Sequence, residues 1–183
     1  MLKHLPNLLS LLRLAAAPLT AWLILQGHDT AALRLFAAAG LSDGLDGFIA
    51  RHWHVTSRFG AWLDPAADKL LMLLCLLALW QINVTPWWLL ALALLRDACI
   101  VAGLGLAQLF GWPLRMQVSA LGKLSTVVQI LYVGSCLLLL AFDLQEPRLL
   151  FAAAFTAAVF TMASWGDYGA VLARAMFAGR RTV

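Results

Sequence analysis

The chain has 183 residues, of which 63% are hydrophobic and 12% are charged. Soluble domains carry roughly 25% charged residues, so this composition indicates a membrane protein and excludes a separate soluble domain. Six crossings of about 20 apolar residues each would use most of the chain. Residues 70–79 are all apolar, which excludes the alternating pattern of outer-membrane barrel strands.

The charge balance fits a membrane setting as well. Thirteen Lys and Arg stand against nine Asp and Glu, for a formal net charge of +4. In so apolar a chain, we interpret the excess of basic residues as a sign of membrane topology and of anionic partners, and not of nucleic-acid binding. Cys75, Cys99 and Cys136 stand singly in apolar runs, without the spacing of a metal or redox site. We expect them to be small buried hydrophobes.

Apolar segments and the turn residues between them predict six transmembrane helices. The predicted spans cover about residues 5–26, 31–50, 59–81, 87–110, 119–142 and 149 into the 160s. No small-residue cleavage site follows the N-terminus, so the first span is expected to be retained. Turn signals follow the first, third and fifth spans at Gly27, Asn83 and Asp143, and the tryptophans near span ends are interpreted as an interfacial belt. The expected fold is all-α, an integral membrane bundle of six transmembrane helices forming a single domain over residues 1–183.

Basic residues lie unevenly around these spans. If the spans alternate, one side carries Lys3, Arg51, Arg58, Arg115, Lys123, Arg174, Arg180 and Arg181, and the other carries Arg34 and Arg148. By the positive-inside rule, the first side is the cytoplasm. Both termini and the loop after residue 50 are therefore expected to be cytoplasmic.

Four aspartates within 26 residues are the candidate chemical groups. Asp43 and Asp46 are three residues apart in the second predicted span. Asp64 and Asp68 are four residues apart in the third. Each pair therefore lies on one face of its helix, and the short loop between the helices lets all four carboxylates converge near the cytoplasmic surface.

Acids in a partly apolar site repel one another and lose hydration. A hard cation is the natural partner, with Mg²⁺ favoured and Mn²⁺ or Ca²⁺ as alternatives.

Residues around the acids suit a bound phosphate. Gly47 and Gly60 lack side chains where a backbone must let a phosphate or nucleotide approach, and Ala50 keeps the same face narrow. Arg51 offers a permanent cationic fork that suits a diphosphate. The window therefore predicts a metal-assisted site for a diphosphate substrate.

The window resembles the signature of the CDP-alcohol phosphotransferase family, Asp-x-x-Asp-Gly-x-x-Ala-Arg, eight residues, Gly-x-x-x-Asp-x-x-x-Asp. All eight fixed positions are met with the family's spacing. The resemblance implies a six-helix homodimeric membrane enzyme of phospholipid biosynthesis, with a Mg²⁺ or Mn²⁺ site that opens to the cytoplasm. It also implies CDP-diacylglycerol as donor, a phosphate-bearing alcohol as acceptor and a location in the cell (inner) membrane.

The resemblance also implies roles for single positions. The metal ligands of the family match Asp43, Asp46, Asp64 and Asp68, and the last of these also matches the general base. The CDP-contacting positions match Asp46, Gly47, Ala50, Arg51, Gly60 and Asp64. The reaction so implied is attack of the acceptor's alkoxide on the lipid-linked phosphorus, with release of CMP.

The acceptor is less closely specified. Residues 6–13 and 122–129 resemble both phosphatidylglycerophosphate synthases, which use glycerol 3-phosphate, and CMP-forming cardiolipin synthases, which use phosphatidylglycerol. We favour glycerol 3-phosphate, although Arg96-Asp97 is more similar to the cardiolipin branch, since the other branch usually has Arg-Glu there. Both acceptors carry phosphate, and the candidate cations for it are Arg13, Arg96, Arg115 and Lys123. Alternatively, Arg96 pairs only with Asp97, and Arg115 serves only topology.

Two other classes of protein fit these residues less well. A cation-coupled transporter would place its acids near the bilayer midplane within inverted repeats, whereas these acids gather at one surface and no repeat is visible. A prenyltransferase also activates a diphosphate with aspartates and metal, but its Asp motifs lie far apart in sequence. His52 and His54 are interpreted as interfacial polar residues instead of metal ligands. Asp167 and Arg174 are interpreted as a solvated terminus.

Overall fold

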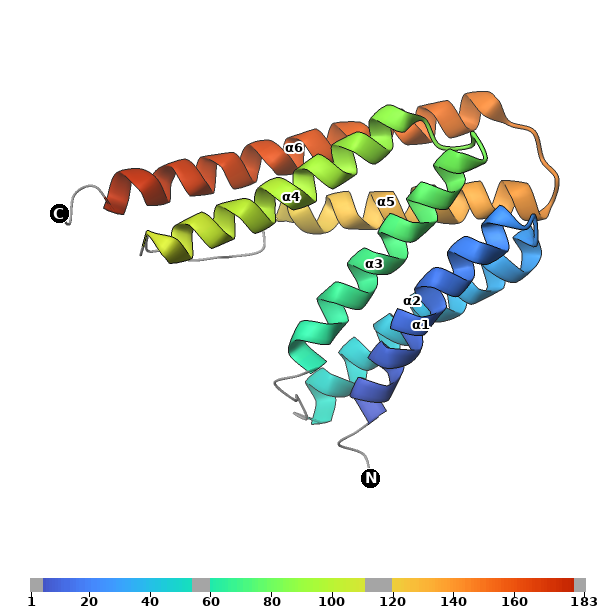
Figure 1. The fold of residues 1–183 in the computed structure, drawn as a ribbon, viewed down its shortest axis with the longest axis horizontal. Helices are drawn as coiled ribbons and strands as arrows, with labels where there is room; N and C mark the ends of the chain where they lie inside the picture. Colours follow the sequence, from blue (N-terminus) through green and yellow to red (C-terminus); the bar gives the residue numbers. More distant parts are fainter. Residues whose placement is uncertain (1–4, 54–59, 111–119, 180–183) are drawn as a thin grey trace. The chain divides into compact units, whose positions relative to one another are not determined.

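The computed structural model is all-helical over the residues that it describes, and its helices follow the predicted order (Figure 1). The structure describes the backbone of residues 5–53, 60–110 and 120–179, and the side chains of residues 11–42, 66–103, 105–106, 109–110 and 120–171. The helices are α1 (Leu5–Leu25), α2 (Asp29–Trp53), α3 (Gly60–Gln81), α4 (Trp87–Leu109), α5 (Ala120–Ala141) and α6 (Pro147–Gly179). The bounds of the first five agree with the predicted spans to within three residues.

The sixth helix is longer than predicted. It runs from Pro147 for 33 residues to Gly179, so Arg174 lies inside a helix and not in a tail, and Asp167 is half-buried. Hydropathy falls near Asp167, but no proline follows Pro147 in the chain to break the helix. The fall in hydropathy therefore marks where an apolar span ends, while the backbone continues because helix formation does not require apolar residues.

Three helices end in the same hydrogen-bonding motif. Gly27 after α1 has a φ of 73°, and Asn83 after α3 and Asp143 after α5 have φ values of 61° and 51°. In each case the next residue's N–H bonds back five residues, as from His28 to the Leu23 carbonyl at 2.9 Å. This is the Schellman motif, which satisfies carbonyls that a helix end would leave open. The three turns that the sequence predicted after these helices are confirmed.

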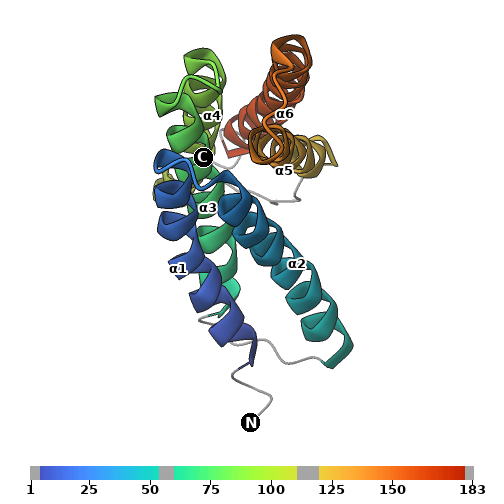
Figure 2. The ribbon, with the colours of Figure 1, turned by 90° about the vertical axis from the view of Figure 1, so that its right-hand side faces the viewer.

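Two compact units make up the chain. Unit 1 contains residues 1–85 and 133–150, and unit 2 contains residues 86–132 and 151–183. In unit 1, α1 packs against both α2 and α3 (Figures 1 and 2). The fully or nearly fully buried apolar residues of these three helices are Ala17, Ile24, Ala32, Ala67, Leu71, Cys75, Leu76, Ala78 and Leu79. The single domain predicted over residues 1–183 is not tested by this division and stays a prediction.

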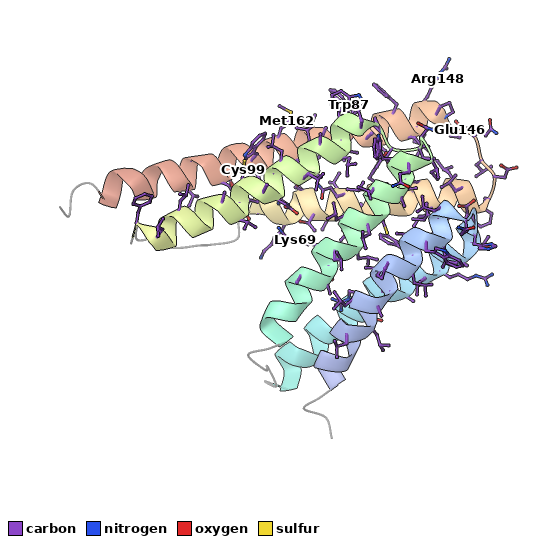
Figure 3. The ribbon with its side chains drawn as sticks, in the orientation of Figure 1. Lys69, Trp87, Cys99, Glu146, Arg148 and Met162 are labelled. Atoms are coloured by element: carbon purple, nitrogen blue, oxygen red, sulfur yellow. The ribbon has the colours of Figure 1, made fainter. Side chains whose placement is uncertain are left out.

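In unit 2, α6 turns small side chains inward and large apolar ones outward. Its buried residues are Ala154, Ala157, Ala158, Thr161 and Ser164. Its exposed residues include Phe151, Phe155, Val159 and Met162, the last of which is labelled in Figure 3. Small residues inside and large apolar ones outside are typical of helices that pack within lipid.

Two helices in the part of the chain with described side chains are long and apolar enough to cross a membrane. They are α5 over its whole length and α6 from Pro147 to Val171. Together with the outward-facing apolar residues, they support membrane association. Six crossings with both termini in the cytoplasm stay a prediction.

Two tryptophans near helix ends are exposed, and two of the three cysteines are buried. Trp87, the first residue of α4, is 68% exposed (Figure 3), and Trp22 near the end of α1 is 52% exposed. Such exposure near helix ends suits an interfacial anchor. Cys75 and Cys136 are buried, and Cys99 is half-buried. The prediction of small buried hydrophobes is therefore confirmed for Cys75 and Cys136, whereas Cys99 is only partly buried.

The glycine that ends α1 can be tested against a glycine inside α2. Gly27→Ala should lower the unfolding free energy by about 1–2 kcal/mol, because a Cβ is unfavourable in the left-handed region. Gly40→Ala should raise it by up to about 1 kcal/mol, because alanine favours the helix and its Cβ would meet nothing within 4 Å. Unfolding of the detergent-solubilised variants measures both, and equal shifts of the same sign would contradict this account of the turn.

Candidate active site

Both pairs of predicted metal ligands belong to helices. Asp43 and Asp46 lie in α2, and Asp64 and Asp68 lie in α3. The helical spacing that puts each pair on one face is therefore present in the backbone. Asp68 has a described side chain, whereas the other three side chains lie outside the described residues. α1 packs against both of the helices that carry these acids.

The predicted CDP-contacting positions lie near the same helix ends. Gly47, Ala50 and Arg51 belong to the last part of α2, and Gly60 is the first residue of α3. Their surroundings fall outside the described side chains, as do those of His52 and His54. The predicted contacts of these residues stay predictions.

Asp68 forms a short ion pair with Arg13. The Arg13 Nη1 atom donates a hydrogen bond of 2.8 Å to Oδ1 of Asp68. The Arg13 side chain is 1% exposed, while that of Asp68 is 42% exposed. A fully buried cation from α1 thus holds one oxygen of a carboxylate that solvent reaches.

The position of Arg13 follows from the buried face of α1. Arg13, Ala17, Thr20 and Ile24 are all buried and recur at the three- and four-residue spacing of one helix face. Thr20 donates its hydroxyl to the Ala16 carbonyl at 2.8 Å, so its polar group is satisfied within the helix. Arg13 therefore extends from the packed face of α1 and not from a face that meets solvent.

The predicted acids fit a hard divalent cation by their chemistry. Four carboxylates provide oxygen ligands only, which is the donor set that Mg²⁺ and Mn²⁺ prefer. Among the described side chains, no three His, Cys, Asp or Glu residues form a group that could hold a metal ion, and Asp68 is the one predicted ligand that lies among them. The fit therefore rests on the donor set and on the helical spacing of the pairs.

Arg96 is a second buried arginine, and it joins the three helices of unit 2. Its side chain is 8% exposed, and its Nη1 donates a 3.0 Å bond to Oδ1 of the neighbouring Asp97. Its Nη2 lies 3.3 Å from the Ser164 hydroxyl and 3.5 Å from the Gly122 carbonyl. The guanidinium carbon also lies 6.0 Å from the centre of the Tyr168 ring, within range of a cation–π contact. Nε of Arg96 is buried without a hydrogen-bond partner among the described residues.

A buried polar cluster continues between α5 and α6. The Gln129 side-chain amide donates a 2.9 Å bond to the Thr161 hydroxyl, and Ser125 lies 3.4 Å from the same hydroxyl. Thr161 in turn donates to the Ala157 carbonyl at 2.7 Å. All three side chains are buried. Hydrogen bonds of this kind between helices provide partners for polar side chains, which lipid tails cannot provide.

The structure locates three of the four predicted acceptor-binding cations. Arg13 and Arg96 are buried and bonded to aspartates. The contact of Arg96 with Asp97 is present, but Arg96 also reaches Gly122 and Ser164, so it does not pair with Asp97 alone. Lys123 is exposed near the start of α5, and Arg115 lies outside the described residues. A phosphate-binding role for any of the four stays a prediction.

Sequence reasoning missed the partners of these arginines on other helices. Asp68 is 55 residues from Arg13, and Ser164 is 68 residues from Arg96, so no local pattern connects them. The polar cluster did carry a signal, since Gly122, Ser125 and Gln129 recur at one-face spacing in an otherwise apolar helix.

Comparison with known proteins identifies related sequences. A cardiolipin synthase (CMP-forming) of Streptomyces coelicolor is 41% identical over 140 residues, which cover 73% of this chain and 64% of that protein. The human cardiolipin synthase (CMP-forming) is 34% identical over 148 residues, covering 72% and 49% of the two chains. A chloroplastic CDP-diacylglycerol–glycerol-3-phosphate 3-phosphatidyltransferase of Oryza sativa subsp. japonica is 32% identical over 184 residues, covering 91% and 56%.

The matched regions thus span less than two thirds of the length of each of these relatives. The sequence model of the CDP-alcohol phosphatidyltransferase family matches residues 3–166. That range includes both acid pairs, Arg13 and Arg96, and it covers most of the chain. The protein therefore belongs to the CDP-alcohol phosphatidyltransferase family.

Proposed function

We propose that this protein is a CDP-diacylglycerol-dependent phosphatidyltransferase of phospholipid biosynthesis. The observation that carries the proposal is the placement of the complete signature on α2 and α3, in a chain that belongs to the family. Asp43, Asp46, Asp64 and Asp68 would hold Mg²⁺ or Mn²⁺. When bound, the cation would neutralise the diphosphate of the donor and stabilise charge that develops at the phosphorus.

The chain's own residues would bind the donor and move one proton. Asp46, Gly47, Ala50, Arg51, Gly60 and Asp64 would contact the CDP group. Asp68 would accept the proton of the acceptor's hydroxyl as a general base. The acceptor oxygen then forms a bond to the lipid-linked phosphorus, the bond from that phosphorus to the bridging oxygen of CMP breaks, and CMP leaves. The partial exposure of Asp68, at 42%, is consistent with access for an acceptor.

The membrane setting supports this chemistry. We propose that all six helices cross the cell (inner) membrane as one domain, with both termini and the acids at the cytoplasmic side, where the basic residues concentrate. A cytoplasmic site lets a nucleotide product leave into water while the lipid chains stay in the bilayer. As in the family that the sequence resembles, the working form is proposed to be a homodimer.

Two acceptors suit the proposed activity. Relatives named cardiolipin synthase reach 41% identity, and Arg96-Asp97 is the pair that resembles that branch. The relative named for glycerol 3-phosphate is 32% identical, but over 91% of this chain. We therefore place phosphatidylglycerol first and glycerol 3-phosphate second, which reverses the order favoured from the sequence. Both acceptors carry a phosphate that Lys123 or Arg115 could bind.

Metal removal tests the role of the acids. Because carboxylates that converge need a cation, EDTA should abolish release of CMP from CDP-diacylglycerol, and added Mg²⁺ or Mn²⁺ should restore it. Purified enzyme in detergent, dialysed exhaustively, is suitable for the assay. Full activity in EDTA would contradict a metal-assisted mechanism.

Substitution of Asp68 tests the general base. Asp68→Asn keeps the shape of the side chain but cannot take a proton, so kcat should fall at least ~10²-fold, while CDP-diacylglycerol still binds. Asp143→Asn is a matched control, because Asp143 lies in the turn after α5 and is exposed. Near-normal turnover in Asp68→Asn would make the assignment of the base wrong.

The acceptor is tested by supplying glycerol 3-phosphate and phosphatidylglycerol in separate reactions while CMP is measured. Lys123→Ala should raise KM for the active acceptor far more than KM for CDP-diacylglycerol, because it removes a phosphate contact without altering the acids. Arg148→Ala is the control, since Arg148 is exposed in the first turn of α6 (Figure 3) and is predicted to lie on the opposite side of the membrane. An unchanged acceptor KM in Lys123→Ala would exclude Lys123 from acceptor binding.

A further inference from the structure

Arg13 and Asp68 form a pair whose two members differ sharply in exposure. The guanidinium lies within the α1–α3 packing, at 1% exposure, whereas 42% of the Asp68 side chain is accessible. The 2.8 Å bond between Nη1 and Oδ1 joins them. One end of this pair is fixed in the protein interior, and the other end is accessible from outside the protein.

The burial of Arg13 fixes its position. An arginine side chain stays protonated inside proteins, and moving its charge away from a carboxylate within an apolar interior is costly. Its neighbours along the same face, Ala17 and Thr20, are fully buried, so a movement of Arg13 toward solvent would disturb the packing of α1. The guanidinium therefore constrains the carboxylate more than the carboxylate constrains the guanidinium.

We propose that Arg13 is a positioning residue that holds the Asp68 carboxylate in the orientation needed to accept the acceptor's proton. The inference rests on the proposed role of Asp68 as general base. Arg13 exchanges no proton in the step, since the proton moves from the acceptor hydroxyl to Asp68 while Arg13 keeps its charge. An aspartate side chain has two freely rotating bonds, and a charge-assisted hydrogen bond from a rigid donor restricts both.

The sequence suggested another role for Arg13, as a cation that binds the acceptor's phosphate. The two roles predict different kinetics. A positioning residue acts through Asp68, so its loss lowers kcat and leaves the acceptor KM nearly unchanged. A phosphate-binding residue contacts the acceptor itself, so its loss raises the acceptor KM.

The experiment is a double-mutant cycle on the full-length protein in detergent or nanodiscs. The variants are Arg13→Gln, Arg13→Lys, Asp68→Asn, the double variant Arg13→Gln with Asp68→Asn, and the control Arg34→Gln. Arg34 is an exposed residue of α2, so the control removes an arginine charge away from the pair. Thermal unfolding of each variant identifies those that fold, and Arg13→Lys keeps a buried positive charge if Arg13→Gln does not fold.

We expect Arg13→Gln to lower kcat at least about 10-fold with less than about 3-fold change in either KM, and Arg13→Lys to lie between it and the wild type. The double variant should be no more than about 3-fold slower than Asp68→Asn alone, because residues that act as a unit are not additive. Arg34→Gln should match the wild type. Binding of Mn²⁺, followed by electron paramagnetic resonance without substrate, should weaken in Arg13→Gln and should not weaken further when that substitution is added to Asp68→Asn.

Other results would overturn the inference in identifiable ways. A raised acceptor KM with unchanged kcat in Arg13→Gln would assign Arg13 to phosphate binding and leave the proposed function intact. Losses that multiply in the double variant would show that Arg13 acts independently of Asp68. Near-normal turnover in Asp68→Asn would instead contradict the proposed base, whatever the behaviour of Arg13.

Discussion

A charge inside an apolar helix bundle has to meet an opposite charge or a hydrogen-bonding group, because neither lipid nor an apolar core can hydrate it. Two buried arginines of this protein satisfy that constraint in different ways. Arg13 is bonded to an aspartate on another helix, 55 residues away. Arg96 is bonded to the adjacent Asp97 and also reaches groups on two other helices. Both therefore connect helices that are distant in sequence, and both lie within the region matched by the family.

The same constraint explains why polar side chains lie buried between α5 and α6 in unit 2 while the outer face of α6 is apolar. Serine, threonine and glutamine side chains between α5 and α6 bond to one another, while phenylalanine and methionine side chains of α6 face outward. In a soluble protein this arrangement would expose apolar surface at a cost in free energy. In a membrane it pairs these serine, threonine and glutamine side chains within the protein and leaves the apolar surface to the lipid.

Much of the fold could be predicted from the sequence, because turns and hydropathy are local properties. Gly27, Asn83 and Asp143 mark helix ends through their own backbone preferences, and the predicted bounds of five helices agree with the structure. The end of α6 could not be predicted in this way, since the fall in hydropathy near Asp167 does not stop a helix.

Part of the candidate site could likewise be predicted from the sequence, and part of it could not. The acid pairs are a local pattern, and their placement on α2 and α3 follows from spacing alone. The contact between Arg13 and Asp68 depends on how α1 packs against α3, which no local pattern encodes. The sequence identifies Arg13 as a candidate cation for the acceptor's phosphate. Its contact with Asp68 is seen only in the structure, where α1 packs against α3.

The separation of Arg13 from Asp68 along the chain bears on the order in which the helices are synthesised. α1 leaves the ribosome 55 residues before the carboxylate that pairs with its arginine. A lone arginine at the centre of a helix raises the free energy of insertion into the bilayer by about 2.5–3.5 kcal/mol, so α1, if it crosses the bilayer as proposed, would benefit from delayed release into lipid until α3 has been made. Arg96 is not separated from its counter-ion in this way, because Asp97 is the next residue to be translated. If α1 and α4 both cross the bilayer as proposed, the arginine of α1 would meet its counter-ion only after α3 has been made, whereas α4 would carry its counter-ion from the start.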